Sequence, residues 1–384
     1  MDYSQRPLLV FWEVTKACPL SCRHCRANAI LKPLPGELTT EEGFELLRQV
    51  AEFGKPYPVV VFTGGDPLMR SDIFELLDYA KSLGIPAALA PAVSERLLDE
   101  DVLKSIKGSG VYSVSISLDG ATPTTHDYIR NREGVFEMTM KALRMIRSLE
   151  IPVQVNTTVM KVNVHELPMV VKLLRELNVR VWEVFFLIHV GRGIELEALS
   201  PDETEDVVNF LYDVSKYGFV VRTVEAPFYR RVAIQRFAAE SGLAKVELRH
   251  GPLYRQLMEG LTRLMGNPPR AVDRPKIART RDGDGVIFVA YNGDVSPSGF
   301  LPIKLGNVRE EELVKIYREN PMLLRIRRGE YNGRCGECEY RLICGGSRAR
   351  AYAELNDPLG EDPACTYAPN SIRLPEDYLK SYLA

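Results

Sequence analysis

The stretch FWEVTKACPLSCRHCRAN, residues 11–28, joins an apolar run to a cysteine-rich loop. Its thiols, Cys18, Cys22 and Cys25, follow a C-x3-C-x2-C spacing. A [4Fe–4S] cubane has four iron corners and usually takes four thiolates. Three cysteines in one short loop can hold three corners and leave one iron open, so we predict a catalytic iron–sulfur site. A zinc knuckle with His24 nearby is the alternative, although zinc loops favour C-x2-C pairs that close a tetrahedron.

The remaining cysteines form a second group near the end of the chain. Cys335, Cys338, Cys344 and Cys365 follow C-x2-C-x5-C-x20-C, and no cysteine lies between the two groups. Four thiolates suit either tetrahedral zinc or a fully ligated [4Fe–4S] cluster, and spacing alone does not separate the two. The surrounding segment has little core-forming periodicity, so we expect a metal to hold it together.

Apolar runs alternate with amphipathic stretches between the two cysteine groups. The predicted strands are Leu8–Val14, Val59–Thr63, Ala87–Ala90, Val111–Ser117, Val153–Val159 and Val181–Leu187. The predicted helices are Thr40–Phe53, Asp72–Leu83, Leu97–Lys107, Phe136–Leu149, Glu166–Leu177 and Asp202–Lys216. Continuous apolar strands are typical of a parallel sheet covered by helices. We therefore predict an α/β fold, a partial (β/α)6 TIM-like barrel, whose chemistry lies at the carboxyl ends of the strands.

Three domains are predicted from these patterns. Residues 1–225 form the barrel core, residues 226–280 a helical, basic connector or cap, and residues 281–384 a small C-terminal iron–sulfur domain. Within the last domain, the segment GDGVIFVAYNGDVSPSGF, residues 283–300, predicts a β-hairpin with Asn292-Gly293-Asp294 as its turn.

Composition excludes several classes of partner. The 49 basic and 51 acidic residues nearly balance, so nucleic acid is not expected as the main ligand. The first residues lack the pattern of a signal peptide, and no apolar run reaches the roughly 18–20 residues that a membrane helix needs. We expect a soluble, cytoplasmic protein without a membrane partner.

The cysteine triplet and the segment Gly64–Pro67 after the second predicted strand resemble the radical S-adenosylmethionine (SAM) superfamily. The resemblance implies that SAM chelates the open iron and is cleaved to a 5′-deoxyadenosyl radical. In that family a Gly-Gly-Glu-type motif binds the methionyl ammonium; this chain has Asp66 in place of the usual Glu. The resemblance implies SAM contacts from these residues: His24, Gly64, Gly65, Asp66, Ser117, Asp119, Arg130, Asn156 and Leu187.

The second cysteine group resembles the shortened SPASM-type (twitch-like) domains of radical SAM enzymes that act on tetrapyrroles. Such enzymes include the heme synthases of the siroheme-dependent pathway and the enzyme of heme d1 synthesis. The matching blocks include FTGGDPL, SISLDG, VNTTV, GRCGECEYRLICGGSRARAY and DPACTYAP. The resemblance implies an auxiliary [4Fe–4S] cluster on Cys335, Cys338, Cys344 and Cys365. Family cysteines often stand where this chain has Ser298 and Ser347, so the chain has ligands for one auxiliary cluster and fits a sister group of the heme synthases.

The resemblance implies hydrogen abstraction from a small-molecule substrate. Our main hypothesis is oxidative decarboxylation of tetrapyrrole propionates, with ferredoxin or flavodoxin as electron donor. Such carboxylates need cationic partners, for which we consider Arg192, Arg230, Arg231, Arg348 and Arg350. A ribosomal peptide maturase is the alternative enzyme, disfavoured because a first cysteine at residue 18 leaves no room for a leader-binding domain. An iron–sulfur electron carrier or metal-binding module is the alternative outside enzymes.

Overall fold

The computed structural model describes residues 3–246, 248, 250–268, 274–275 and 277–383. The predicted connector, 226–280, therefore includes positions outside the described residues: 247, 249, 269–273 and 276. The chain divides into two compact units. The first contains residues 1–156, 189–196 and 282–327, and the second contains residues 157–188, 197–281 and 328–384.

The first unit is built on a mostly parallel sheet. Its strands are β1 (Leu9–Thr15), β2 (Val59–Gly64), β3 (Ala87–Leu89), β4 (Ser113–Ser117), the start of β5 (Val153–Val159), β9 (Gly285–Val289), β10 (Asp294–Ser296) and β11 (Gly306–Asn307). They lie in the order β11-β10-β9-β1-β2-β3-β4-β5. Strand β1 is central because it pairs in parallel with both β2 and β9. The division of the sequence into units falls within the two-residue strand β8 (Arg281–Asp282).

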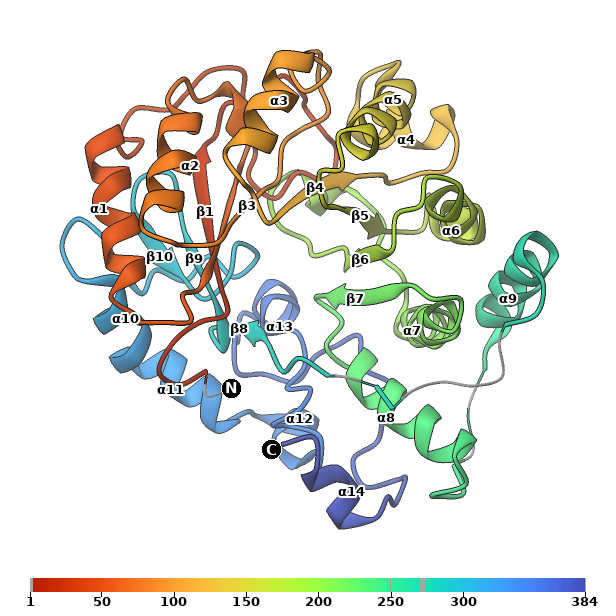
Figure 1. The fold of residues 1–384 in the computed structure, drawn as a ribbon. Helices are drawn as coiled ribbons and strands as arrows, with labels where there is room; N and C mark the ends of the chain where they lie inside the picture. The colour runs from red at the N-terminus through yellow and green to blue at the C-terminus, as the bar shows by residue number, and fades with distance from the viewer. Residues whose placement is uncertain (1–2, 247, 249, 269–273, 276, 384) are drawn as a thin grey trace. The chain divides into compact units, whose positions relative to one another are not determined.

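Helices follow most of these strands. They are α1 (Thr40–Ala51), α2 (Ile73–Ser82), α3 (Glu100–Gly108), α4 (Pro123–Arg130), α5 (Val135–Ser148), α10 (Leu313–Glu319) and α11 (Pro321–Arg328), with the 3-10 turns η1 (Pro67–Met69) and η3 (Gly191–Glu195). Helix α1 begins in a capping box, because Thr39 accepts from the backbone of Glu42 while the Glu42 carboxylate accepts from Thr39. In Figure 1, α1 and α2 lie side by side next to the first strands.

Large apolar side chains form the core of the first unit. Trp12 on β1 and Phe62 on β2 are fully buried, and their ring centroids lie 5.5 Å apart. Fully burying side chains of this size contributes roughly 1.5–3 kcal/mol each. The core therefore fixes the strand that leads into the first cysteine loop.

The second unit contains the other β/α elements and the C-terminal segment. Strand β6 (Val181–Phe186) pairs in parallel with β7 (Val220–Val224). Its helices are α6 (Leu167–Glu176), α7 (Pro201–Ser215), α8 (Tyr229–Glu240), α9 (Pro252–Met265), α12 (Gly333–Glu337), α13 (Arg348–Leu355) and α14 (Glu376–Lys380), with the turn η2 (Val164–Glu166). Helix α9 packs against both α6 and α7.

The predicted α/β barrel-like fold is confirmed. All six predicted strands and all six predicted helices are present, with boundaries that differ by a few residues. The predicted hairpin is also present, since β9 and β10 pair in antiparallel fashion. Helix α4 and strand β7 were not predicted, and neither was the parallel pairing of β9 with β1. Among the described helices, none has both the length and the apolarity to cross a membrane.

Candidate functional site

The first cysteine loop leaves the carboxyl end of β1 and is closed by backbone hydrogen bonds. The amide of Cys18 donates to the carbonyl of Ile30 at 2.7 Å, and the amide of Ile30 donates to Lys16 at 3.0 Å. The amide of Asp66, after β2, donates to the carbonyl of Ala17 at 2.7 Å. The loop is thus anchored at both of its ends and to the neighbouring strand.

Arg192 holds the middle of the same loop. Its backbone amide donates to the carbonyl of Cys25 at 3.0 Å, its Nε to the carbonyl of Cys22 at 2.8 Å, and its Nη1 to that of Ala29 at 3.0 Å. The preceding Gly191 has φ +56°, and a Cβ there would lie 2.5 Å from the carbonyl oxygen of Cys25. The segment Gly191–Arg192 therefore needs a glycine in order to approach the loop this closely.

Two thiols of this loop accept hydrogen bonds of the kind that suit metal-bound sulfur. The sulfur of Cys18 accepts from the amide of Leu20 at 3.4 Å, and that of Cys22 accepts from Arg130 Nη1 at 3.6 Å. Burial raises the pKa of Cys18 to about 12. A buried thiol of this kind stays protonated unless a cation binds it, and coordination deprotonates it. The donor set therefore fits an iron–sulfur cluster.

The Gly64-Gly65-Asp66 segment lies directly beside this loop. A Cβ on Gly65 would lie 2.3 Å from the carbonyl oxygen of Ala17, so only glycine fits there. The Asp66 carboxylate is buried and accepts from the amides of Leu68 at 3.1 Å and Ala92 at 3.3 Å. Burial raises the pKa of Asp66 to about 6. This carboxylate holds the turn after β2 and the segment after β3 together.

A buried ion pair between Asp119 and Arg130 lies next to Cys22. Asp119 lies 2.5 Å from Arg130 Nη2 and 3.7 Å from His24 Nε2. Burial lowers the pKa of His24 to about 4, so its ring is neutral near pH 7. Within the described part of the chain, the buried Nδ1 of His24 has no hydrogen-bond partner. These residues present a cation, an anion and an open ring nitrogen beside Cys22.

The structure also pairs two of the predicted SAM contacts of the first unit, although Asn156 lies within β5 and not at its end. Ser117 ends β4 and pairs in register with Asn156 on β5. The amide of Leu118 donates to the carbonyl of Asn156 at 2.8 Å. Leu187, the remaining predicted SAM contact, is buried in the second unit just after β6.

The second cysteine group lines one pocket of the second unit, together with Arg231, Tyr340, Gly346, Asp362 and Tyr367. Backbone amides donate to its sulfurs: Asp362 to Cys335 at 3.4 Å, Tyr340 to Cys338 at 3.4 Å, and Gly346 to Cys344 at 3.5 Å. Cys365 accepts from the backbone of Tyr367. Burial raises the pKa of Cys338 to about 12 and that of Cys365 to about 11. Four sulfurs that each accept an amide fit a ligand set for one cluster.

Among the described residues, no group of three or more His, Cys, Asp or Glu side chains has the compact arrangement that would hold a single metal ion. A cubane instead binds each thiolate to a different iron.

The arginines considered for substrate carboxylates have internal acceptors. Arg230 donates to the carbonyls of Ile343 and Thr280, and Arg231 pairs with Glu205. Arg350 pairs with Asp362, Arg348 contacts Cys335, and Arg192 holds the first cysteine loop. These contacts do not support the sequence prediction, because each guanidinium already stabilises the fold. The sequence missed these roles since most of the acceptors are distant along the chain.

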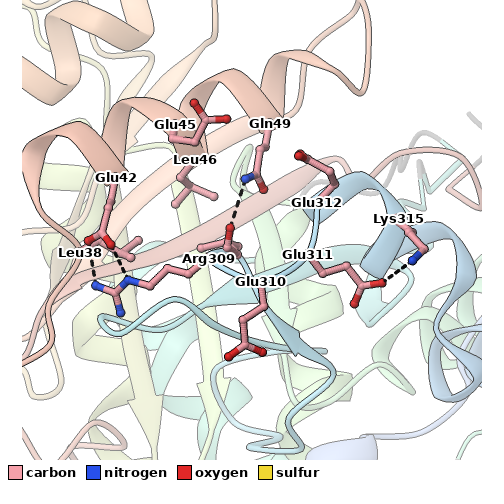
Figure 2. A pocket seen from close by; sticks show the side chains of 11 residues that line it. Leu38, Glu42, Glu45, Leu46, Gln49, Arg309, Glu310, Glu311, Glu312 and Lys315 are labelled. Carbon is pink, nitrogen blue, oxygen red and sulfur yellow. Dashed lines mark hydrogen bonds and ion pairs between the residues drawn. The ribbon is translucent and has the colours of Figure 1, made fainter.

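One pocket of the first unit has no cysteine in its lining (Figure 2). Its lining includes acidic side chains of α1 and of the segment before α10, among them Glu42, Glu45, Glu310 and Glu312. Figure 2 shows Arg309 against Glu42, where Nε and Oε1 lie 2.6 Å apart. This ion pair joins α1 to the segment that follows β11, and we assign the pocket no ligand.

A parallel α/β sheet with a three-cysteine loop after its first strand defines the class as an iron–sulfur enzyme with a barrel-like core. Residues 12–174 match the family model of the radical SAM superfamily, and residues 281–339 match that of an iron–sulfur cluster-binding domain, SPASM. The chain belongs to the radical SAM superfamily. It is a radical SAM enzyme, with [4Fe–4S] clusters and SAM as its cofactors, so the electron-carrier alternative is excluded.

Relatives match nearly the whole chain. An AdoMet-dependent heme synthase of Nitratidesulfovibrio vulgaris is 36% identical over 97% of this chain and 95% of its own length. An enzyme of the same name from Methanosarcina barkeri is 34% identical over 94% of this chain and 97% of its own. A PqqA peptide cyclase of Gluconobacter oxydans is 27% identical over 97% of this chain and 94% of its own.

The fold is shared with solved structures. Streptococcus suis SuiB bound to S-adenosylmethionine superposes with a TM-score of 0.65 at 16% identity, covering 94% of this chain and 77% of that one.

Proposed function

We propose that the chain converts propionate side chains of a tetrapyrrole to vinyl groups, as a heme synthase does. The similarity to AdoMet-dependent heme synthases, 36% identical over 97% of the chain, carries this proposal. The same similarity supports a tetrapyrrole carboxylate, such as iron-coproporphyrin III, as the substrate class. Ser298 and Ser347 stand where family members often have cysteines, and this difference is compatible with a related tetrapyrrole as the substrate.

We assign the first cluster to Cys18, Cys22 and Cys25. When bound, this cluster supplies the electron that cleaves SAM to the radical that takes one hydrogen from the substrate. We assign the binding of the methionyl part of SAM to residues of the protein. The backbone at Gly64 and Gly65 receives the methionyl ammonium, and Arg130 receives the carboxylate through its guanidinium fork.

Other residues of the site position these groups. Asp119 holds Arg130 and lies beside the neutral ring of His24, to which we assign a contact with the adenine. We also assign Leu187 a contact with SAM. Ser117, at the end of β4, and Asn156, within β5, supply polar contacts to SAM, and Asp66 holds the glycine turn. The domain boundaries 1–225, 226–280 and 281–384 remain part of this proposal.

The reaction balances with one further electron acceptor. Loss of a hydrogen atom from the β-carbon of a propionate, followed by release of carbon dioxide and one electron, leaves a vinyl group. We assign the acceptor to a second cluster on Cys335, Cys338, Cys344 and Cys365. An electron donor such as ferredoxin or flavodoxin starts each turnover, and we place the reaction in the cytoplasm, where thiols remain reduced.

The test is an anaerobic assay of the enzyme reconstituted with iron and sulfide, given SAM, dithionite and iron-coproporphyrin III. We expect 5′-deoxyadenosine together with a porphyrin that has lost the mass of two carboxyl groups and two hydrogens. Tetrapyrrole-independent turnover that instead modifies a peptide encoded beside the gene would replace this function with peptide maturation. The similarity to a PqqA peptide cyclase is what favours that second candidate.

A further inference from the structure

Arg348 is the first residue of α13, and its side chain, which carries a guanidinium, is fully buried. Its Nη2 donates to the sulfur of Cys335 at 3.6 Å. Its other hydrogen bonds go to backbone carbonyls of Gly346, Pro358 and Gly360. The guanidinium also stacks over the ring of Tyr331, 4.5 Å from its centroid.

The charge of Arg348 is compensated differently from that of its neighbours. Arg350 has the carboxylate of Asp362 at 3.2 Å, and Arg231, which also lines the cysteine pocket, has that of Glu205 at 2.6 Å. Among the described contacts of Arg348, the acceptor that can carry a negative charge is the sulfur of Cys335. Burying a cation costs several kcal/mol unless an anion accompanies it. The fold therefore supplies a cation whose partner is the metal-ligating sulfur itself.

Gly346 shows how closely these two groups approach each other. Its φ is +66°, and a Cβ there would lie 2.5 Å from Arg348 Nη2 and 2.9 Å from the sulfur of Cys335. Any side chain at this position would be forced between the guanidinium and the sulfur. The amide of Gly346 meanwhile donates to Cys344 at 3.5 Å. One short segment thus binds two of the four sulfurs and leaves space for the cation.

We propose that Arg348 is the fixed counter-charge of the auxiliary cluster and raises its reduction potential, which lets it accept the electron released by the substrate. This inference rests on the proposed function, since it assumes a cluster on these four cysteines. Reduction adds one negative charge to a cluster, and a nearby cation stabilises the more negative state. Arg348 is on this account a positioning residue, because it acts through the cluster and not on the substrate.

The experiment is a redox titration of the reconstituted holoenzyme, followed by electron paramagnetic resonance, for wild type, Arg348→Lys and Arg348→Gln. We expect Arg348→Gln to lower the potential of the auxiliary cluster. The expected change in the ratio of reduced to oxidised cluster is about tenfold at a fixed potential, which is 59 mV for a one-electron couple. Arg348→Lys keeps the positive charge, so its auxiliary cluster should have a potential close to that of the wild type. The first cluster serves as an internal reference whose potential stays unchanged.

A matched control removes the two opposite charges of one ion pair, that of Arg231, which lines the cysteine pocket, and that of its partner Glu205. The double variant Glu205→Gln/Arg231→Gln changes no net charge, so its auxiliary cluster should keep the wild-type potential. An unchanged potential in Arg348→Gln with an intact cluster overturns the inference. So does a shift in the double variant as large as that in Arg348→Gln, because packing and not charge would then set the potential.

A second measurement needs no charge-removing variant. Wild-type enzyme labelled with ¹⁵N in the guanidinium groups should show a nitrogen coupling to the reduced auxiliary cluster that disappears in Arg348→Lys. Absence of this coupling in wild type contradicts the inference even if Arg348→Gln does not fold. An iron count of about four with one zinc per chain, against about eight for two cubanes, would instead overturn the proposed auxiliary cluster itself.

Discussion

Cys22 and Cys344 are both buried cysteines, yet they serve different sites in our account. Cys22 accepts from Arg130 Nη1 in the first unit, and Cys344 accepts from the amide of Gly346 in the second. We expect Cys22→Ser to abolish the formation of 5′-deoxyadenosine. Cys344→Ser should still cleave SAM while losing the vinyl product and up to half of the iron. Product analysis and iron determination on the two variants check this, and loss of SAM cleavage in both would contradict the separate roles.

The pH dependence of cluster assembly follows from the raised pKa of the ligand thiol of Cys18. Burial raises the pKa of Cys18 to about 12, so the free thiol carries its proton at neutral pH. Metal binding must displace that proton, and the apparent affinity for iron therefore rises with pH and falls as the pH is lowered. Iron incorporation measured between pH 6 and pH 9, with the protein folded throughout, should increase steadily. Incorporation independent of pH would argue against thiolate ligation by Cys18.

At the scale of elements, the first cysteine loop depends on a segment far away in the sequence. Arg192 makes two hydrogen bonds from a charged group to loop carbonyls, and such bonds contribute about 1.5–3 kcal/mol each. We expect Arg192→Ala to lose iron from the first cluster on the order of tenfold faster or more. Chelation kinetics with an iron-binding dye measure this.

The control is Arg23→Ala in the same loop. Arg23 Nε donates to the carbonyl of Tyr128 at 3.0 Å from an exposed position, and exposed contacts of this kind contribute little. Equal iron loss from both variants would mean that Arg192 has no special role in holding the loop.

Local pattern predicted the strands and helices because continuous apolar runs and amphipathic periodicity are properties of short segments. Helix α4, sequence PTTHDYIR, was missed since it has few apolar positions, although Thr122 caps it. Strand β7 was missed because two of its five residues are exposed and none is buried. The parallel pairing of β9 with β1 joins segments about 275 residues apart, and nothing in either segment signals the other.

At the scale of the whole molecule, the spacing of the cysteines is the basis on which we predict both ligand sets, since ligands carried by one loop leave a local pattern in the sequence. The arginine roles were not predictable, because Arg192 and Arg348 bind backbone carbonyls that any sequence could present. The compact units are discontinuous, whereas our proposed domains are continuous segments. The SPASM match begins at residue 281, where we place the start of the third domain.

The most direct measurement is electron–nuclear double resonance on the reduced enzyme with SAM labelled at its amino nitrogen and its carboxylate oxygens. A first cluster held by Cys18, Cys22 and Cys25 predicts hyperfine coupling from both labels, since the free iron binds both groups. Coupling from neither label, in an enzyme shown to contain the reduced first cluster, would contradict an open iron and with it the proposed chemistry.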